Sequence, residues 1–577
     1  MDCGFLRLLP GYGDYLNGWS RRWSAGQALF LSVIVPALFV SAAWAGGTKP
    51  IALASHTRLQ QELAANQSRD YRLTLNAGQA VTLRLEQDQN RVALRQIAPA
   101  NTLPPRSSDA GRFAFVEWTL IAEQATTWIF RVQALAPDRP ASYRIELDAA
   151  HPASADDRLR ARTEAALSQA ETQRRSHGAG KVKEVSGRYQ TAIAGYRELH
   201  DACGEQAAQI GLARYQLDRG QYADGQTAAE AALRLHCTPD ARDLALRALA
   251  LHTLSSARFY QGDFAGGVRF GKQSLALSRR TRDLQSQEGT LGNLVGDYAE
   301  LGESDHALDM AHAARKLALQ LGDRRNALMD QGNIASIHLS RGELMPALAG
   351  YRKSLALLQA APDPYLEGLV WTNLGMLYNV LGDNAASLDA YARAIALWAE
   401  QQNQPELSAA LWNQGFVFLR QEQNRQACAV FQRALKVTET ANLENDRTHV
   451  LEGLGRCAMA ESDWPRARDY LEQSLTLAKK IGNPAAEIPG TLALGDLALA
   501  RRDFAGARTQ YAQAYKLALR YHDRDSQPSA LAGLARADRD SGNLDAAQQN
   551  VGRALALIAD QRRQIADPGL RTDYFAD

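Results

Sequence analysis

The chain has 577 residues, too many for a single hydrophobic core, so we expect at least two folded units. Hydrophobic residues make up 46% and charged residues 22%, which is typical of a folded, soluble protein. The net charge is only +2 and the sequence has no basic stripe, which argues against binding to nucleic acid.

The first 45 residues carry the features of an export signal. Arg21 and Arg22 precede an apolar stretch at Ala28–Val40, and the small residues that follow end in Ala43-Trp44-Ala45. A positive flank, a short apolar core and an A-x-A site are typical of a secretory signal peptide. The alternative is an uncleaved anchor, since the apolar stretch reaches about 20 residues when its edges are included. Both readings predict an exported protein, either periplasmic or anchored and facing the periplasm, with no other membrane contact.

Residues 51–150 have the alternating pattern of β-strands. Tyr71, Leu73 and Leu75 alternate with polar residues, and after a turn at Asn76–Gly78 the alternation resumes at Val81–Leu85. Similar runs follow at Phe113–Ile121, Trp128–Val132 and Tyr143–Leu147. Short alternating runs bounded by turn residues predict a small antiparallel β-sandwich. We expect a helical linker to follow over residues 151–200.

Residues 201–560 repeat at a nearly fixed interval. Glycines recur every forty positions, the first interval being two positions longer, and the same register continues through three polar residues to a last glycine. The nine anchors are Gly220, Gly262, Gly302, Gly342, Gly382, Glu422, Ser462, Arg502 and Gly542. Glycine adopts the left-handed backbone conformation that a tight turn between two helices requires, so each anchor is expected to mark such a turn.

The positions around each anchor repeat as well. A small residue recurs five and twelve residues after the anchor and a large one nine after it, as in Ala347, Ser354 and Tyr351. Small residues let two helices approach closely, and the large side chain fills the space beside them. These residues at these offsets resemble the tetratricopeptide repeat. The resemblance implies a mostly α protein, a right-handed α-solenoid of about nine two-helix repeats of roughly 40 residues each, preceded by the small β-sandwich.

An asparagine recurs nine residues before the anchor in four consecutive repeats. These residues are Asn293, Asn333, Asn373 and Asn413. In tetratricopeptide proteins this position faces the groove, so the resemblance implies that the four amides bind the backbone of a peptide or protein partner. The alternative is a hydrogen bond between helices, repeated by duplication of one ancestral unit. Four such bonds contribute about 2–6 kcal/mol, which only offsets the roughly 2–5 kcal/mol cost of ordering a peptide. Trp371 and Trp412 lie nearby, either in such a site or between helices.

The cysteines suggest two pairs. Cys203 and Cys237 lie at equal distances before and after Gly220, which places them side by side at the open end of one helix pair. An exported protein permits a disulfide there, the alternative being two unpaired thiols. Cys428 and Cys457 are on neighbouring helices and form a second candidate pair, the alternative being buried thiols.

No catalytic, cofactor-binding or metal-binding motif stands out in the sequence. None of the 11 histidines is in an H-E-x-x-H arrangement, and no C-x-x-C, P-loop or G-x-S-x-G motif is present. His306 and His312 lack companion ligands and are expected on the surface. We therefore expect neither enzymatic activity nor a cofactor.

Two segments resemble parts of bacterial CHAT-domain proteins. Tyr71–Gln79 resembles the β-sandwich that precedes the repeats in those proteins, and Ile558–Phe575 resembles the segment that enters their caspase-like protease domain. The resemblance implies that residues 561–577 are the lead-in to a CHAT domain absent from this sequence, so no catalytic residue can be assigned. We expect a non-catalytic interaction scaffold. The alternatives are the regulatory half of a CHAT-type cysteine protease, whose catalytic domain is lost or on another chain, and an envelope component acting through the β-domain.

Overall fold

The computed structural model describes residues 50–88, 92–99, 106–107, 115–134, 140–175, 182–238, 240–481, 484–521, 523–524 and 526–564. The predicted signal segment, and residues 565–577 of the predicted tail, lie outside this part of the chain. The chain divides into two compact units within one helix, after Asp330. We call them the N-terminal unit, up to Asp330, and the C-terminal unit, from Gln331, and describe each by itself.

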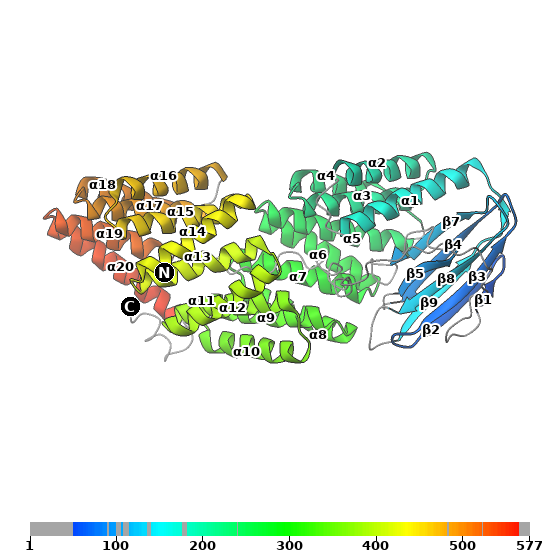
Figure 1. Ribbon diagram of the computed structural model, residues 1–577, viewed down its shortest axis with the longest axis horizontal. Coiled ribbons are helices and arrows are strands. Elements are labelled where there is room, and N and C mark those ends of the chain that lie inside the picture. The colour runs from blue at the N-terminus through cyan, green and yellow to red at the C-terminus, as the bar shows by residue number, and fades with distance from the viewer. Residues whose placement is uncertain are drawn as a thin grey trace, which may run out of the picture. The chain divides into compact units, whose positions relative to one another are not determined.

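In the described residues, the N-terminal unit begins with ten β-strands in two sheets (Figure 1). The strands are β1 (Ile51–Leu53), β2 (Arg58–Leu63), β3 (Ser68–Leu75), β4 (Gln79–Asp88), β5 (Val92–Ala98), β6 (Arg106–Ser107), β7 (Phe115–Ile121), β8 (Thr126–Ala134), β9 (Ala141–Leu147) and β10 (His151–Pro152). One sheet has the order β1-β3-β8-β5-β6. In the other sheet β4 pairs with β7, β9 and β10, and β9 pairs with β2.

The strand pairs of this sandwich are antiparallel with one exception among the described strands. β1 runs parallel to β3, with Ile51 opposite Tyr71. The strand between them in the chain, β2, belongs to the other sheet, so the chain crosses to that sheet and returns in its original direction. The sandwich is thus antiparallel, as expected, except for this one pair.

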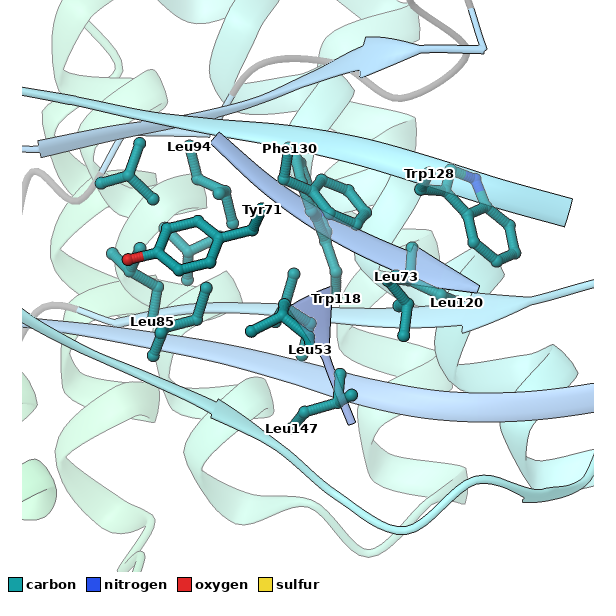
Figure 2. Close-up of a cluster of buried hydrophobic side chains, with 14 of the residues drawn as sticks. Leu53, Tyr71, Leu73, Leu85, Leu94, Trp118, Leu120, Trp128, Phe130 and Leu147 are labelled. Atoms are coloured by element: carbon teal, nitrogen blue, oxygen red, sulfur yellow. The ribbon is translucent and has the colours of Figure 1, made fainter. Parts of the chain in front are cut away.

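The sandwich core follows from the alternation of its strands. Figure 2 shows Tyr71, Trp118 and Phe130 pointing into the space between the strands, and all three are buried. The hydroxyl oxygens of Tyr71 and Tyr143 lie 2.6 Å apart, so the polar ends of two buried rings satisfy each other. Because inward positions are apolar on both sheets, burial of these side chains holds the two sheets together.

Helix α1 (Ala155–Arg175) covers the edge of the sheet formed by β7 (Figure 1). The backbone N–H of Thr119 donates to Oε2 of Glu164 at 2.8 Å, and the Thr119 hydroxyl donates to Oε1 at 3.0 Å. Arg242, on a later helix of the same unit, lies 3.8 Å from Glu117 of β7. An exposed strand edge invites pairing with other chains, and here a buried carboxylate occupies the backbone donor instead. The sandwich is thus fixed to the first helices.

The remaining described chain is helical. The helices after α1 are α2 (Val182–Glu198), α3 (Ala202–Asp218), α4 (Tyr222–Arg234), α5 (Asp240–Tyr260), α6 (Phe264–Arg280), α7 (Leu284–Glu300), α8 (Ser304–Leu321), α9 (Arg324–Ser340), α10 (Leu344–Ala360), α11 (Pro364–Val380), α12 (Asn384–Glu400), α13 (Gln404–Arg420), α14 (Asn424–Thr440), α15 (Glu444–Ala460), α16 (Trp464–Ile481), α17 (Pro484–Ala500), α18 (Phe504–Arg520), α19 (Ser526–Asp540) and α20 (Leu544–Gln564). Helices α3–α20 form the nine two-helix repeats that the sequence register predicts, and α1 and α2 pack as a further pair before them. We call the odd-numbered helix of each repeat its first helix and the even-numbered one its second.

The turn inside each repeat has the backbone conformation expected of its anchor. Gly262 and Gly382 have φ angles of 77° and 74°, in the left-handed region that glycine adopts without strain. Glu422 takes φ 56° at the same register position although it carries a side chain. The turn is therefore set by the packing of the two helices, and glycine only makes it less costly.

Candidate peptide-binding face

The four asparagines predicted to bind peptide lie on the first helices α7, α9, α11 and α13. Asn293 belongs to the N-terminal unit, and Asn333, Asn373 and Asn413 belong to the C-terminal unit. Asn293 and Asn333 are buried, with 7% and 4% of their surface exposed. Asn373 and Asn413 are half-buried, so these two retain surface that a partner can reach.

All four asparagines interact with other residues of the chain, and the partners of the amide nitrogens of Asn293, Asn373 and Asn413 are defined. Nδ2 of Asn293 donates to the Ser256 hydroxyl at 2.8 Å, and Nδ2 of Asn373 approaches the Ser336 hydroxyl at 3.4 Å. Nδ2 of Asn413 donates to the Ala409 carbonyl of its own helix at 2.9 Å. The first two bonds join consecutive first helices, which is the structural alternative considered for this series. Binding of a peptide by these amides remains a prediction.

A second residue of the repeat takes part in these contacts. Ser256 and Ser336 both lie six residues before their anchors, and the Ser336 hydroxyl also lies 2.8 Å from the hydroxyl of Tyr351. Burial raises the pKa of Tyr351, while the hydrogen bond with Ser336 opposes that change. The position six before the anchor thus lies where first helices of adjacent repeats meet. The position six before the anchor can be located from the repeat interval, but the sequence analysis did not consider it as part of a site.

Aromatic side chains occupy the first helices next along the C-terminal unit. Trp412 of α13 stacks on His449 of α15, with ring centroids 4.7 Å apart and an interplanar angle of 19°. Phe416, at the position six before its anchor, packs its ring edge-on to Trp412 at 6.1 Å. All three side chains are half-buried, and the indole Nε1 of Trp412 is buried without a hydrogen-bond partner. Trp371, also half-buried, lies under the guanidinium of Arg393 at 4.7 Å.

In the last three repeats, the position six residues before the anchor is occupied by a charged residue. Arg456, Asp496 and Arg536 follow one another at the repeat interval on α15, α17 and α19. Arg456 lies 3.4 Å from Asp496, and Arg536 lies 3.1 Å from it on the other side. Asp496 also accepts a hydrogen bond from the Tyr511 hydroxyl at 2.6 Å, and burial with this nearby carboxylate raises the pKa of Tyr511. The result is a ladder of alternating charge that sequence reasoning missed.

We group the partly exposed residues of these first helices in the C-terminal unit under one name, the first-helix face. It consists of Asn373, Asn413, Trp412, Phe416, His449, Arg456, Asp496 and Arg536. Trp412 and His449 link α13 to α15, and Arg456 lies seven residues after His449, on the same side of α15. Its chemistry changes from amide through aromatic to charged along the helices. Exposed fractions of 31%, 24% and 50% for Arg456, Asp496 and Arg536 keep the charged end open to solvent.

The structure joins the cysteines in two disulfides. One links Cys203 of α3 to Cys237, just after α4, with Cα atoms 4.8 Å apart. The other links Cys428 of α14 to Cys457 of α15, with Cα atoms 5.7 Å apart. The first closes the open end of one repeat, and the second ties one repeat to the next.

Other chemical features of the described residues are few. His306 is on the surface, where it stacks on Tyr298 and lies 2.9 Å from Glu303, and His312 is exposed as expected. In this part of the chain no group of three or more His, Cys, Asp or Glu side chains is placed to hold a metal ion. Among the same residues, no helix combines the length and apolar character that crossing a bilayer requires.

Comparison with known proteins agrees with the repeat register. Residues 366–440, from α11 to the end of α14, match the family model of the tetratricopeptide repeat. A mouse protein, outer dynein arm-docking complex subunit 4, is 22% identical over 200 residues, which are 35% of this chain and 31% of that protein. This chain thus spans less than a third of that relative.

Solved structures of repeat proteins are also similar. The apo form of the quorum sensor NprR from B. thuringiensis is 14% identical, covering 61% of this chain and 97% of that chain, with a TM-score of 0.46. Aspartyl phosphate phosphatase F from Bacillus subtilis is 12% identical, covering 63% of this chain and 94% of that chain, with a TM-score of 0.44. The repeat register, the nine helix pairs of the described chain and the family match define a tetratricopeptide-type solenoid preceded by a β-sandwich.

Proposed function

We propose that this chain is a non-catalytic scaffold that binds an extended peptide or protein segment along its first-helix face. One observation carries the proposal: partly exposed amide, aromatic and charged side chains lie on consecutive first helices of the C-terminal unit, and neighbouring first helices are joined by the aromatic pair and by the charged ladder. Solenoids bind partners through extended surfaces of this kind, on which each repeat contributes side chains at a fixed interval.

The aromatic and charged parts of the face can supply the binding free energy and the specificity that the amides alone do not provide. Amide hydrogen bonds contribute about 0.5–1.5 kcal/mol each, and at Asn373 part of this capacity is already directed to Ser336. A ligand ring packed on Trp412 would add about 0.5–1.5 kcal/mol beyond its buried area. Pairing of ligand charges with Arg456, Asp496 and Arg536 would fix its register along the face. A segment with an aromatic residue next to charged ones fits this order best.

Peptide binding can be tested without knowing the natural partner. We expect a phage-displayed random peptide library to yield peptides that bind the purified chain. Replacing both Asn373 and Trp412 with alanine should weaken their binding about tenfold or more, because both side chains keep exposed surface on the face. The matched control is His312→Ala, which removes an exposed side chain from the second helix α8. Binding should be measured by calorimetry.

The outcome against this proposal is equally definite. Selected peptides that bind the Asn373→Ala, Trp412→Ala variant as tightly as the unaltered chain would place their site away from the first-helix face. Helical circular dichroism should show that both variants are folded at the temperature of the binding assay, so that weaker binding is not attributed to unfolding.

We further propose export of the chain, and disulfides that form because of it. The support is the signal-like sequence of residues 1–45 together with two cysteine pairs within bonding distance. Peptide mapping without reductant, on protein from the periplasmic fraction, should recover Cys203 linked to Cys237 and Cys428 linked to Cys457. A full-length cytoplasmic product with four free thiols would contradict both parts.

A second candidate function is regulation of a CHAT-type cysteine protease carried elsewhere. It is favoured by the resemblance of Tyr71–Gln79 and Ile558–Phe575 to segments of CHAT-domain proteins. The DNA downstream of this sequence provides the test. An adjacent CHAT reading frame whose product copurifies with this chain supports regulation, and its absence leaves the scaffold.

A further inference from the structure

One of the two disulfides joins neighbouring repeats. Cys428 is on α14, the second helix of one repeat, and Cys457 is on α15, the first helix of the next. The disulfide between Cys203 and Cys237 instead closes a single repeat. The contact between α14 and α15, which we call the α14–α15 junction, is therefore held in part by a bond that a reductant can break.

The two preceding junctions of the C-terminal unit have apolar residues at the same register positions. These positions are six residues after one anchor and five before the next, and the pairs there are Leu348 with Leu377 and Leu388 with Val417. Leu377 and Val417 are buried, as is Cys457. Two thiols are smaller than two branched side chains. A reduced α14–α15 junction therefore has neither the covalent bond nor the apolar side-chain volume that the preceding junctions have at this point.

Part of the first-helix face crosses the same junction. Trp412 of α13 and His449 of α15 stack with ring centroids 4.7 Å apart, so this contact joins the two repeats that the disulfide joins. Arg456, which begins the charged ladder, directly precedes Cys457 on α15. A shift of α15 relative to α14 therefore changes the positions of His449 and Arg456 relative to Trp412.

The two disulfides differ in their access to solvent. Cys428 is half-buried, whereas Cys203 and Cys237 are each only 5% exposed. Thiol–disulfide exchange begins when a thiolate attacks one sulfur atom of the disulfide, so its rate depends on whether that atom can be reached. A soluble dithiol should therefore attack Cys428 first, with the buried Cys457 as the leaving thiolate.

We propose that the Cys428–Cys457 disulfide is a redox-sensitive link, and that its reduction by a dithiol loosens the α14–α15 junction and weakens peptide binding on the first-helix face. A thiolate of the dithiol attacks the Cys428 sulfur, the S–S bond breaks, and Cys457 leaves as a thiolate that takes up a proton. The second thiol of the reductant then attacks the mixed disulfide and releases Cys428. Two electrons and two protons pass to the cysteines, and the dithiol becomes a disulfide. The effect on binding rests on the proposed function, whereas the loosening of the junction does not.

Reduction is expected to open this junction locally without unfolding the array. A repeat array is stabilised by contacts between neighbouring repeats, so weakening one junction acts mainly at that place. The ring of Phe431 still packs between Gly415 of α13 and Gly453 of α15, where added Cβ atoms would lie 2.7 Å and 2.2 Å from it. The two repeats thus stay joined, but with a larger population of locally open states.

Hydrogen exchange on the purified full chain tests the loosening of the junction. Dithiothreitol should reduce Cys428–Cys457 about tenfold faster than Cys203–Cys237, as measured by alkylation of the new thiols and peptide mapping. At a concentration that reduces only the first of these disulfides, the backbone amides of α14 and α15 should exchange about tenfold faster or more. The amides of α10 and α11, at a junction without cysteines, are the internal control and should keep their rates.

Calorimetry with peptides selected against the oxidised chain tests the effect on binding. Peptides that require Asn373 and Trp412 should bind the reduced chain about tenfold more weakly, because the two sides of the face no longer keep a fixed spacing. The Cys428→Leu, Cys457→Val variant takes its pair from the preceding junction. It should bind these peptides like the oxidised chain, with or without dithiothreitol.

The matched control is the Cys203→Ala, Cys237→Ala variant, which removes the other disulfide and should respond to dithiothreitol like the unaltered chain. Unchanged exchange in α14 and α15 after reduction would overturn the proposal, regardless of peptide affinity. So would faster exchange with an unchanged affinity of the peptides that require Asn373 and Trp412. Selected peptides that do not require these two residues would contradict the proposed function instead, and the exchange rates would still decide whether the disulfide controls the junction.

Discussion

Asp297→Asn is expected to raise the free energy of unfolding of the N-terminal unit at pH 8 while changing it little at pH 4. Asp297 lies on α7 and is fully buried. One carboxylate oxygen accepts a 3.3 Å hydrogen bond from Ser255, but the other has no hydrogen-bond partner. In other repeats the equivalent position, five before the anchor, is apolar, as in Ile337, Leu377 and Val417.

The sign of the pH effect follows from the pKa of this carboxyl group. Burial raises the pKa of Asp297 to about 7, with a further small increase from Asp263, whereas the Ser255 hydroxyl opposes the change. In the unfolded chain the same group titrates near its ordinary value of about 3.9. Stability is therefore fully present below about pH 4 and is lost as the pH rises to about 7. At about 1.4 kcal/mol per pKa unit, the loss approaches 4 kcal/mol.

Urea unfolding at pH 4, 6 and 8, followed by circular dichroism, measures this effect. Asp297→Asn should reduce the decline of the unfolding free energy between pH 4 and pH 8. Asp224→Asn removes a carboxylate from the exposed side of α4 and should leave this decline unchanged. Equal pH profiles for unaltered chain and Asp297→Asn would show that the buried carboxyl group does not govern stability.

The Asp297 carboxylate fits between the helices because the residue facing it on the neighbouring helix is a glycine. A Cβ at Gly267 would lie 2.1 Å from a carboxylate oxygen of Asp297. Most other repeats have alanine at this position, five after the anchor, together with an apolar residue opposite. Gly267→Ala should thus be destabilising alone and tolerated with Asp297→Ala, a coupling that a double-mutant cycle measures.

The fold could be predicted because the repeat register carries more information than local propensity. Glu422, Ser462 and Arg502 are poor candidates for a left-handed turn by residue type, yet the constant spacing places them at one, and all three have φ between 56° and 61°. In the β-sandwich, alternation predicted most strands, but the three residues of β1 are too few to reveal a parallel partner in β3. Pairing between distant strands leaves no periodic trace in a short segment.

The candidate site was predicted only in part, since spacing identifies a position and not its partner. The asparagine series was visible from its interval, but the bonds of Asn293 and Asn373 depend on Ser256 and Ser336 in the preceding repeat. The residues of the ladder from Arg456 to Arg536 have the same interval. Because their residue type changes from arginine to aspartate and back, they are recognised as a series only when opposite charges are compared. Both features arise between repeats, where the packing of successive helices determines which side chains meet.

The contact between successive repeats also predicts the cost of one added methyl group. Phe431 of α14 is fully buried between Gly415 of α13 and Gly453 of α15. A Cβ would lie 2.7 Å from the ring at Gly415 and 2.2 Å from it at Gly453. The ring is thus held on both sides and cannot move away from a new methyl group. Gly453→Ala is expected to destabilise the C-terminal unit by about 3 kcal/mol, the upper range for overpacking, despite alanine's better helix propensity.

Gly332→Ala is the matched control, because it makes the same substitution within helix α9 of the same unit and its Cβ would meet no atom within 4 Å. This variant should gain about 0.5–1 kcal/mol from helix propensity alone. Adding Phe431→Leu to Gly453→Ala should recover part of the lost stability, since the smaller side chain vacates the ring position. Chemical unfolding of the four proteins gives the comparison. If Gly453→Ala and Gly332→Ala shift the unfolding free energy equally, close packing of Phe431 against α15 does not join these two repeats.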